Sequence, residues 1–185
     1  MKKSYVFLAK GFEEIEALTV VDVMRRAGMP VEMIGPLVRD CVRGAHGVEV
    51  MADDHVSNVD LDDAEWLICP GGMPGATNLA DSFVLTDMLV EHAGRGGLVA
   101  AICASPAVVL APIGVLNGRK AVCYPGMEVD GYGVQWQPHE SVVTDGNIVT
   151  GRGPASAAEF ALALVRKSLG EAAAAEVAAG MLLNM

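Results

Sequence analysis

The sequence has no cluster of lysine or arginine residues, and its acidic residues outnumber its basic ones. Its 185 residues include 13 Lys and Arg against 23 Asp and Glu, so the formal net charge is −10. Binding to nucleic acids or to anionic lipids is driven by dense positive charge and counter-ion release. We therefore expect neither a nucleic-acid partner nor a membrane partner.

The sequence also lacks an uninterrupted apolar run that could serve as a signal peptide or a membrane span. Near the N-terminus the apolar stretch covers only residues 5–9 before charged residues follow. The uncharged segment 96–118 is long enough to span a bilayer, but Pro106 and Pro112 interrupt it. We interpret it as a buried strand, a turn and a buried helix, and we expect a cytoplasmic protein.

Cysteine pairs with metal-binding or redox spacing are missing as well. The four cysteines stand alone at positions 41, 69, 103 and 123, with no CxxC motif and no paired histidines. No GxxxxGK[ST] phosphate loop is present either. The sequence therefore predicts reduced thiols, no metal site and no cofactor.

What the chain does contain is enough apolar residue types for one sizeable core. They make up 52% of the sequence, charged residues make up 19%, and no repeat or Pro/Ser-rich linker divides the chain. We expect residues 1–185 to form a single domain.

Stretches typical of strands alternate with stretches typical of helices along the chain. The predicted strands are 4–9, 30–34, 48–51, 65–69 and 97–102, and the predicted helices are 13–27, 82–92, 105–111, 156–170 and 171–183. Residues 115–137, rich in Gly and Pro, are expected to form loops and short strands. This alternation predicts an α/β fold with a mostly parallel central sheet and helices on both faces.

Cys103 lies where the most apolar predicted strand ends and a helix is expected to begin. Small residues, Ala101, Ala104 and Ser105, surround it, as a tight nucleophile elbow requires. The N–H groups and the dipole of the following helix would favour the thiolate and lower the pKa of Cys103. The alternative is that Cys103 is simply a small buried residue.

Several segments closely resemble the ThiJ/PfpI superfamily and its protein-deglycase branch. The resembling segments are AAICASP at 100–106, LAKGFEEIE at 8–16, VDVMRRAG at 21–28, PGGMPGA at 70–76, GRGP at 151–154 and EFA at 159–161. They keep the family's order and extend over almost the whole chain. The resemblance implies a flavodoxin-like sandwich, a nucleophilic Cys103 and, commonly, a homodimer.

The resemblance also implies roles for individual residues. Glu16 matches the protonated carboxyl that hydrogen-bonds the cysteine sulfur, which requires a raised pKa and hence burial. On a helical projection, however, Glu16 is not clearly set apart from Glu13. Gly72 and Ala104 match the positions whose N–H groups form an oxyanion hole.

Two positions depart from the pattern of many family members. Tyr124 stands where many members carry a histidine near the thiol, so a Cys-His dyad is not expected. His46 falls where relatives carry an arginine, and it is a candidate for lining the site or a subunit contact. His55, His92 and His139 are expected at the surface.

Three functions follow from these expectations. The first is a cysteine-dependent glyoxalase or protein deglycase with a stress-protective role, which acts on methylglyoxal, glyoxal or their early protein adducts. The second is a non-catalytic redox sensor or redox-regulated chaperone that uses oxidation of Cys103. The third, an intracellular cysteine peptidase, is weakened because Tyr124 replaces the expected base.

Overall fold

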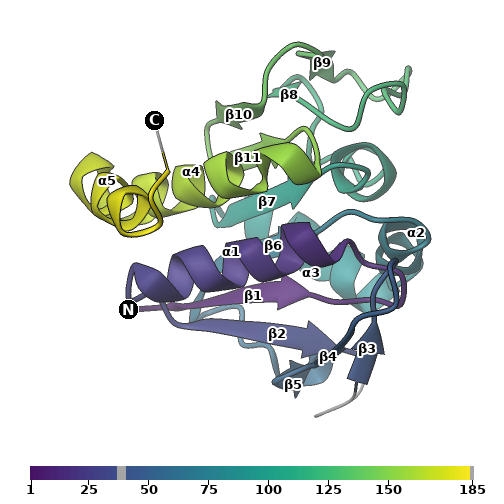
Figure 1. Ribbon diagram of the computed structural model, residues 1–185. Helices are drawn as coiled ribbons and strands as arrows, with labels where there is room; N and C mark the ends of the chain where they lie inside the picture. The colour runs from purple at the N-terminus through teal and green to yellow at the C-terminus, as the bar shows by residue number, and fades with distance from the viewer. Residues whose placement is uncertain (37–40, 184–185) are drawn as a thin grey trace.

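The computed structural model describes residues 1–36 and 41–183, and its centre is a seven-stranded sheet (Figure 1). Six strands are parallel to their neighbours, and β10 pairs antiparallel with β11 at one edge. In spatial order the strands are β10 (Val142–Asp145), β11 (Ile148–Gly151), β7 (Leu98–Ile102), β6 (Ala64–Cys69), β1 (Lys3–Phe7), β2 (Val31–Gly35) and β5 (Asp54–His55). The predicted mostly parallel sheet is confirmed.

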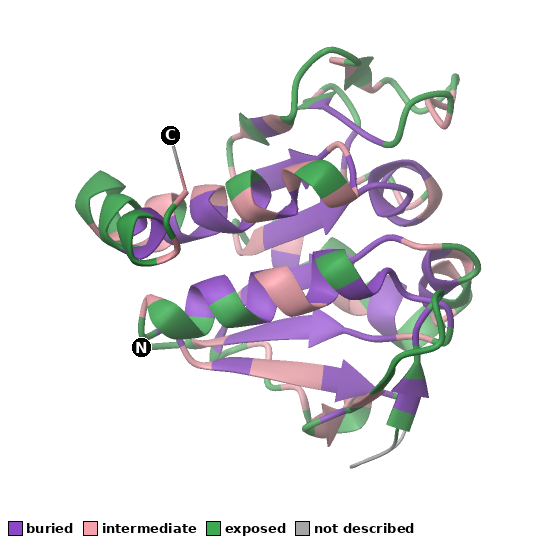
Figure 2. Cartoon of the chain, in the orientation of Figure 1, coloured by how far each residue is buried: buried purple, intermediate pink, exposed green. Residues whose placement is uncertain are grey.

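Helices cover both faces of this sheet, each over its own apolar cluster. One face carries α1 (Glu14–Arg26), α4 (Ala157–Leu169) and α5 (Glu171–Gly180), and α1 and α4 lie side by side in Figure 1. The other carries α3 (Phe83–Gly94) and a π-helix (Pro106–Leu110), with α2 (Gly75–Ala80) at the end to which the parallel strands point. Figure 2 shows the central strands buried between these layers, as the continuous apolar runs predict.

Two short sheets and two 3₁₀ turns complete the described elements. β3 (Cys41–Arg43) and β4 (Glu49–Met51) form an antiparallel hairpin, and β8 (Lys120–Ala121) pairs parallel with β9 (Gln135–Trp136). The 3₁₀ turns are Val56–Asn58 and Pro154–Ser156. The hairpin lies beside the start of α1, so it borders the site described below.

Register brings the ends of β6 and β7 together at the carboxyl edge of the sheet. Cys69, the last residue of β6, is paired with Ala101, and Gly151 at the end of β11 is paired with Ile102. The turn after β6 therefore lies next to Cys103, which follows β7. Sites in open α/β sheets form at this edge.

The structure differs from the sequence expectations in several local features. The strands β3, β5, β10 and β11 were not expected, although β11 pairs with β7 in the central sheet. The helix α2 was not expected, because the glycine-rich PGGMPGA segment has the composition of a turn. The helix expected at 105–111 is a π-turn, in which the Ala111 N–H donates to the Pro106 carbonyl at 3.0 Å. His92, expected at the surface, is only 3% exposed because Gly97 leaves room for its ring.

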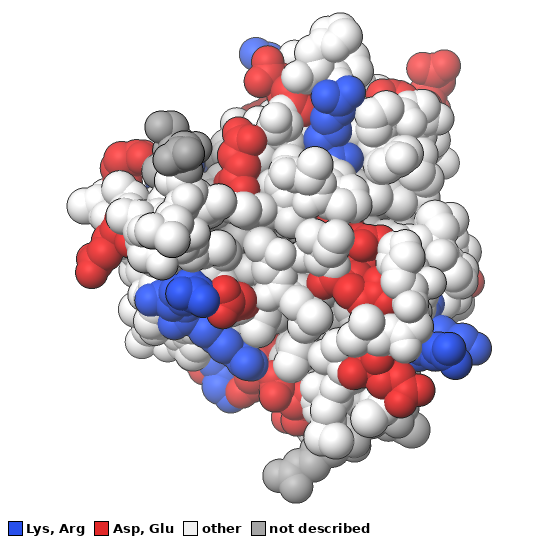
Figure 3. Space-filling model, viewed as in Figure 1, with Lys and Arg blue, Asp and Glu red and all other residues white. Residues whose placement is uncertain are grey.

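The described residues show neither a basic surface patch on the face in view nor a membrane-spanning helix, as the composition predicts. On the face drawn in Figure 3, Lys and Arg lie in separate groups with acidic residues between them. Among residues 1–36 and 41–183, no helix combines the length and the apolar character needed to cross a membrane.

Candidate active site around Cys103

Cys103 occupies a strained elbow between β7 and the π-helix. Its φ is 63°, in the left-handed region that residues with a Cβ rarely adopt. The backbone is held there because the Cys103 N–H donates to the Gly151 carbonyl at 2.9 Å and its carbonyl accepts from Tyr124 N–H at 2.8 Å. The predicted elbow is confirmed, and only 8% of the residue is exposed.

Glu16 reaches the elbow from the first turns of α1. Glu16 is completely buried, and its Oε2 accepts a hydrogen bond from the Gly71 N–H at 2.7 Å. Oε1 is buried with no hydrogen-bond partner among the described residues. The carboxyl interacts with the Cys103 thiol. The burial that the resemblance requires of Glu16 is therefore present.

Gly71 makes this contact possible because it has no side chain. A Cβ at Gly71 would lie 2.5 Å from the Cys103 Cβ and 2.7 Å from Glu16 Oε2. Both distances are far below van der Waals contact. The local sequence assigns no role to Gly71, although the doubled glycine after β6 is a visible signal.

The thiol and the carboxyl form a coupled pair. Burial raises the pKa of Glu16 from 4.5 to about 7, against the opposing hydrogen bonds from Cys103 and Gly71. Burial and the charge of Glu16 raise the pKa of Cys103 from 9.0 to about 12. At pH values between about 7 and about 12, the pair of Cys103 and Glu16 holds one proton. The net charge of the pair is the same whether this proton is on the sulfur or on the carboxyl oxygen. A proton can therefore move between the two groups.

The predicted lowering of the pKa of Cys103 is wrong. The expectation rested on the N–H groups and dipole of a following α-helix, but the sequence could not show the two opposing effects. The backbone N–H groups of Gly72 and Ala104 do lower the pKa of the thiol, yet burial and the neighbouring Glu16 outweigh them. Removing the proton from Cys103 therefore requires a base, and Glu16 is in place to be that base.

The backbone N–H groups of Gly72, in the turn after β6, and of Ala104, next to the thiol in the chain, act on the Cys103 sulfur and lower the pKa of the thiol. Gly72 has a φ of 87°, and a Cβ there would lie 2.4 Å from the Glu13 nitrogen. Only glycine fits this position. The two N–H groups are arranged to stabilise negative charge that develops beside Cys103.

Tyr124 is joined to the elbow by its backbone N–H, which donates to the Cys103 carbonyl. It also lines a neighbouring cleft of about 320 Å³. Its side chain is 47% exposed and faces Gly153, where a Cβ would lie 3.5 Å from the ring. The cleft is lined by Tyr124, Pro125, Ser141, Arg152, Gly153, Pro154, Ala155, Ser156 and Glu159. Cys103 is not part of this lining, so the cleft lies beside the thiol rather than over it.

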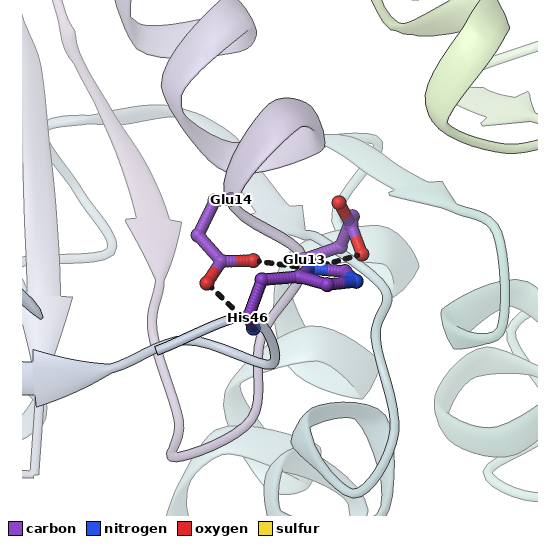
Figure 4. A group of neighbouring side chains, drawn as sticks. All are labelled: Glu13, Glu14 and His46. Atoms are coloured by element: carbon purple, nitrogen blue, oxygen red, sulfur yellow. Dashed lines mark hydrogen bonds and ion pairs between the residues drawn. The ribbon is translucent and has the colours of Figure 1, made fainter. Parts of the chain in front are cut away.

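His46 is placed outside the Cys103 pair. Its Nδ1 lies 2.9 Å from Glu14 Oε2 and 3.5 Å from Glu13 Oε2, as Figure 4 shows. Its side chain is 71% exposed, and the hydrogen bond with Glu14 together with the charges of Glu13 and Glu14 raises the pKa of the imidazole. The structure thus unites Cys103, Glu16, Gly72 and Ala104 and leaves His46 in a separate cluster. Sequence reasoning did not identify Glu14 as its partner.

The other three cysteines differ from Cys103 in their surroundings. All four are free thiols. Cys69 and Cys123 are buried, and burial raises the pKa of each to about 12. Cys41 is exposed on β3. Among the cysteines, Cys103 alone has the left-handed backbone of an elbow.

Comparisons with known proteins give matches over most of the chain. A model of the DJ-1/PfpI family matches residues 2–167. Protein dj-1beta of Drosophila melanogaster is 37% identical over 185 residues, covering 98% of this chain and 97% of that protein. A glutathione-independent glyoxalase of Caenorhabditis elegans is 33% identical over 153 residues, covering 83% and 81%. The solved structure of Toxoplasma gondii DJ-1, oxidized, has a TM-score of 0.92 at 40% identity and covers 100% of both chains.

Proposed function

Because the chain belongs to the DJ-1/PfpI family, as its motifs predicted, we propose that it is a cysteine-dependent glyoxalase or protein deglycase. Its substrates are methylglyoxal, glyoxal or their early adducts on protein side chains, and its role is protective under stress. The similarity to a protein named as a glutathione-independent glyoxalase supports this choice.

The observation that carries the proposal is the buried contact of Glu16 with Cys103 at the elbow. A carboxyl with a pKa of about 7 can both accept and donate a proton near neutral pH. The nearby N–H groups of Gly72 and Ala104 supply stabilisation for an oxyanion. These are the parts that addition of a thiol to an aldehyde requires.

In the first step, Cys103 Sγ forms a bond to the aldehyde carbon while Glu16 takes the thiol proton. The π electrons of the carbonyl move to its oxygen, whose negative charge Gly72 and Ala104 N–H groups stabilise. Glu16 then returns the proton to this oxygen. The product is a neutral hemithioacetal and a Glu16 carboxylate.

In the second step, for methylglyoxal, Glu16 removes the hydrogen of the former aldehyde carbon as a proton and delivers it to the adjacent carbon. The hydroxyl proton of the hemithioacetal passes to the ketone oxygen, so the first carbon is oxidised to a thioester and the second is reduced from a ketone to an alcohol. Water then cleaves the thioester, which releases lactate and restores the Cys103 thiol. The internal oxidation and reduction balance without an external oxidant.

The proposal is tested by following methylglyoxal consumption and lactate formation with purified wild type and Cys103→Ser. We expect the variant to be inactive, since a hydroxyl is a much weaker nucleophile than a thiol. Cys41→Ser, which changes an exposed cysteine, is the matched control and should keep wild-type rates. Retained turnover in Cys103→Ser would refute the proposal.

A redox sensor is the second candidate, and the surroundings of the sulfur favour it specifically. Oxidation of Cys103 to a sulfinate would place anionic oxygens near the Gly72 and Ala104 N–H groups and the Glu16 carboxyl. The similar Toxoplasma gondii structure is of an oxidized protein. Peroxide treatment followed by peptide mass analysis tests this: modification of Cys103 before the exposed Cys41, without dicarbonyl turnover, supports a sensor. Equal modification of all four cysteines contradicts it.

A homodimer and a cytoplasmic location belong to the same proposal. Size-exclusion chromatography with light scattering tests the dimer, and cell fractionation tests the location. A peptidase activity is less favoured because Tyr124 stands where a peptidase of this type would place its histidine base.

A further inference from the structure

The cleft of about 320 Å³ beside the Cys103 pair has no role in the mechanism described above. Its two walls are joined to the nucleophile elbow by backbone hydrogen bonds. Tyr124 on one wall donates its N–H to the Cys103 carbonyl at 2.8 Å. Arg152 on the other wall directly follows Gly151, whose carbonyl accepts from the Cys103 N–H at 2.9 Å. The cleft is therefore placed to receive the part of a substrate that extends away from the reacting carbon.

Hydrogen bonds hold the Arg152 wall in a fixed shape. The Gly153 N–H donates to Ser156 Oγ at 3.1 Å, and this hydroxyl donates to the Gly153 carbonyl at 2.9 Å. The Arg152 N–H donates to the Ser141 carbonyl at 2.9 Å. The Tyr124 ring lies against Gly153, where a Cβ would be 3.5 Å from the ring. Because small-molecule sites are mostly pre-formed clefts of roughly 300–1,000 Å³, this cleft suits a small ligand.

Arg152 supplies a positive charge to the cleft. Among residues 1–36 and 41–183, no carboxylate forms an ion pair with its guanidinium, although the residue is only partly exposed. Five other arginines are each paired with a carboxylate: Arg25 with Asp53, Arg26 with Asp22, Arg95 with Asp62, Arg119 with Asp145 and Arg166 with Glu171. A guanidinium binds carboxylates through two parallel hydrogen bonds. Arg152 therefore points to an anionic ligand in the cleft.

The charge around the cleft favours a carboxylate over a phosphate. Glu159 also lines the cleft, but it is exposed, so solvent and salt screen its charge. The chain as a whole carries a net charge of −10. A dianionic phosphate would be repelled by these charges about twice as strongly as a carboxylate with a single charge.

We propose that the cleft binds the carboxylate tail of an α-ketoaldehyde substrate, with Arg152 holding the carboxylate while Cys103 attacks the aldehyde. This inference rests on the proposed function and names a substrate class within it, since methylglyoxal and glyoxal have no such tail. Arg152 contacts a part of the substrate that does not react. Its loss should therefore raise KM more than it lowers kcat.

The kinetic test compares dioxovalerate with propylglyoxal as substrates. Both are α-ketoaldehydes with a three-carbon tail, which ends in a carboxylate in the first and in a methyl group in the second. We expect the ratio of their kcat/KM values to fall about tenfold in Arg152→Gln, as loss of a hydrogen bond between charged groups implies. Arg152→Lys, which keeps the charge, should give an intermediate ratio.

Two further variants serve as controls for charge. Glu159→Gln removes the acidic residue of the cleft and should raise the ratio, by a smaller factor because the residue is exposed. Lys167→Gln removes an exposed positive charge from the last turn of α4 and should keep the wild-type ratio. Circular dichroism checks that the variants are folded.

A binding measurement separates this inference from the proposed function. Levulinate carries the same carboxylate tail on an unreactive methyl ketone. In titrations followed by NMR, it should bind wild type and Cys103→Ser alike and Arg152→Gln about tenfold more weakly. If wild type consumes neither α-ketoaldehyde, the proposed function fails and levulinate binding alone decides whether the cleft takes a carboxylate.

Three results would overturn the inference. The first is an equal kcat/KM ratio, or an equal levulinate affinity, in wild type and Arg152→Gln. The second is no levulinate bound by wild type. The third is a structure of the homodimer in which the second copy fills the cleft.

Discussion

Glu14 and Glu16 lie two residues apart on α1, and both are more than nine-tenths buried, yet the pKa values of their carboxyls shift in opposite directions. Burial acts to raise the pKa of Glu14, but hydrogen bonds from His46 and from backbone N–H groups hold it below its ordinary value. Burial prevails at Glu16, whose partners are one backbone N–H and the Cys103 thiol. Hydrogen-bond donors outweigh burial at Glu14, whereas burial outweighs the donors at Glu16, which lies deeper in the protein.

The difference matches two different tasks on one helix. Glu14 stays ionised and fixes the β3–β4 hairpin to the start of α1. Glu16 titrates near neutral pH and can exchange a proton with Cys103. The following predictions test this contrast.

The largest effect is expected on activity from Glu16→Gln. An amide has the same shape but can neither accept nor return a proton, so kcat/KM for methylglyoxal should fall about 10²- to 10⁴-fold. Steady-state kinetics measure this, with Asp22→Asn, an exposed substitution on the same helix, as the control. Rates close to wild type in Glu16→Gln would remove Glu16 from the proposed mechanism.

The next effect is on the pH dependence of stability. The folded pKa of Glu16 is raised to about 7 from 4.5, so its contribution is present below pH 4.5 and is lost as pH rises through about 7. This corresponds to about 3 kcal/mol of unfolding free energy. Urea unfolding is followed between pH 4.5 and 8. The unfolding free energy of Glu16→Gln should not fall over this range, so the variant should be more stable relative to wild type at pH 8 than at pH 4.5. Parallel pH profiles for the two proteins would contradict it.

Glu14→Gln should show the opposite pH dependence and a somewhat smaller effect. The folded pKa of Glu14 is lowered, so its contribution is present above the ordinary value of 4.5 and is lost as pH falls through the folded pKa. Weakening its charged hydrogen bonds to the hairpin should cost about 1–3 kcal/mol at neutral pH. The same urea series measures it, and a loss that persisted unchanged in acid would show that the charge is unimportant.

The smallest effect is expected from His46→Gln. The raised pKa of His46 means that its ion pair stabilises the fold below pH 6.5 and ceases to do so as pH rises through the folded pKa. Because the imidazole is exposed, the loss should be smaller than that of either carboxyl substitution. Unfolding at pH 6 and pH 9, with His139→Gln as control, measures the difference. A larger loss at pH 9 than at pH 6 would be inconsistent with the pair.

Elements with a strong local pattern could be predicted from the sequence. The continuous apolar run before Cys103 predicted a central parallel strand, and small neighbours predicted the elbow. The π-turn could not be foreseen, because Pro106 is compatible with the first turn of an α-helix as well. His92 was misplaced because its burial depends on Gly97, a tertiary contact with no periodic signal.

The candidate site could be predicted only in part for a similar reason. Motif resemblance identified Glu16 and Cys103, but a helical projection alone did not separate Glu16 from Glu13. Burial first and the charge of Glu16 second raise the pKa of Cys103, and only the fold determines that they outweigh the N–H groups that lower it. The cluster of Glu13, Glu14 and His46 joins segments far apart in the chain, so no local sequence pattern could predict it.

The residue at position 71 distinguishes related sequences that can form the contact between the cysteine and the glutamate from those that cannot. The cysteine and the glutamate alone do not make this distinction. A protein with this backbone could keep both the cysteine and the glutamate yet carry alanine at position 71, and its extra methyl group would occupy the space between them. Such a protein would keep both reactive side chains but would lack the contact through which we propose that the proton moves. Surveys that classify relatives by the presence of the nucleophile and the carboxyl should therefore also read the residue at position 71.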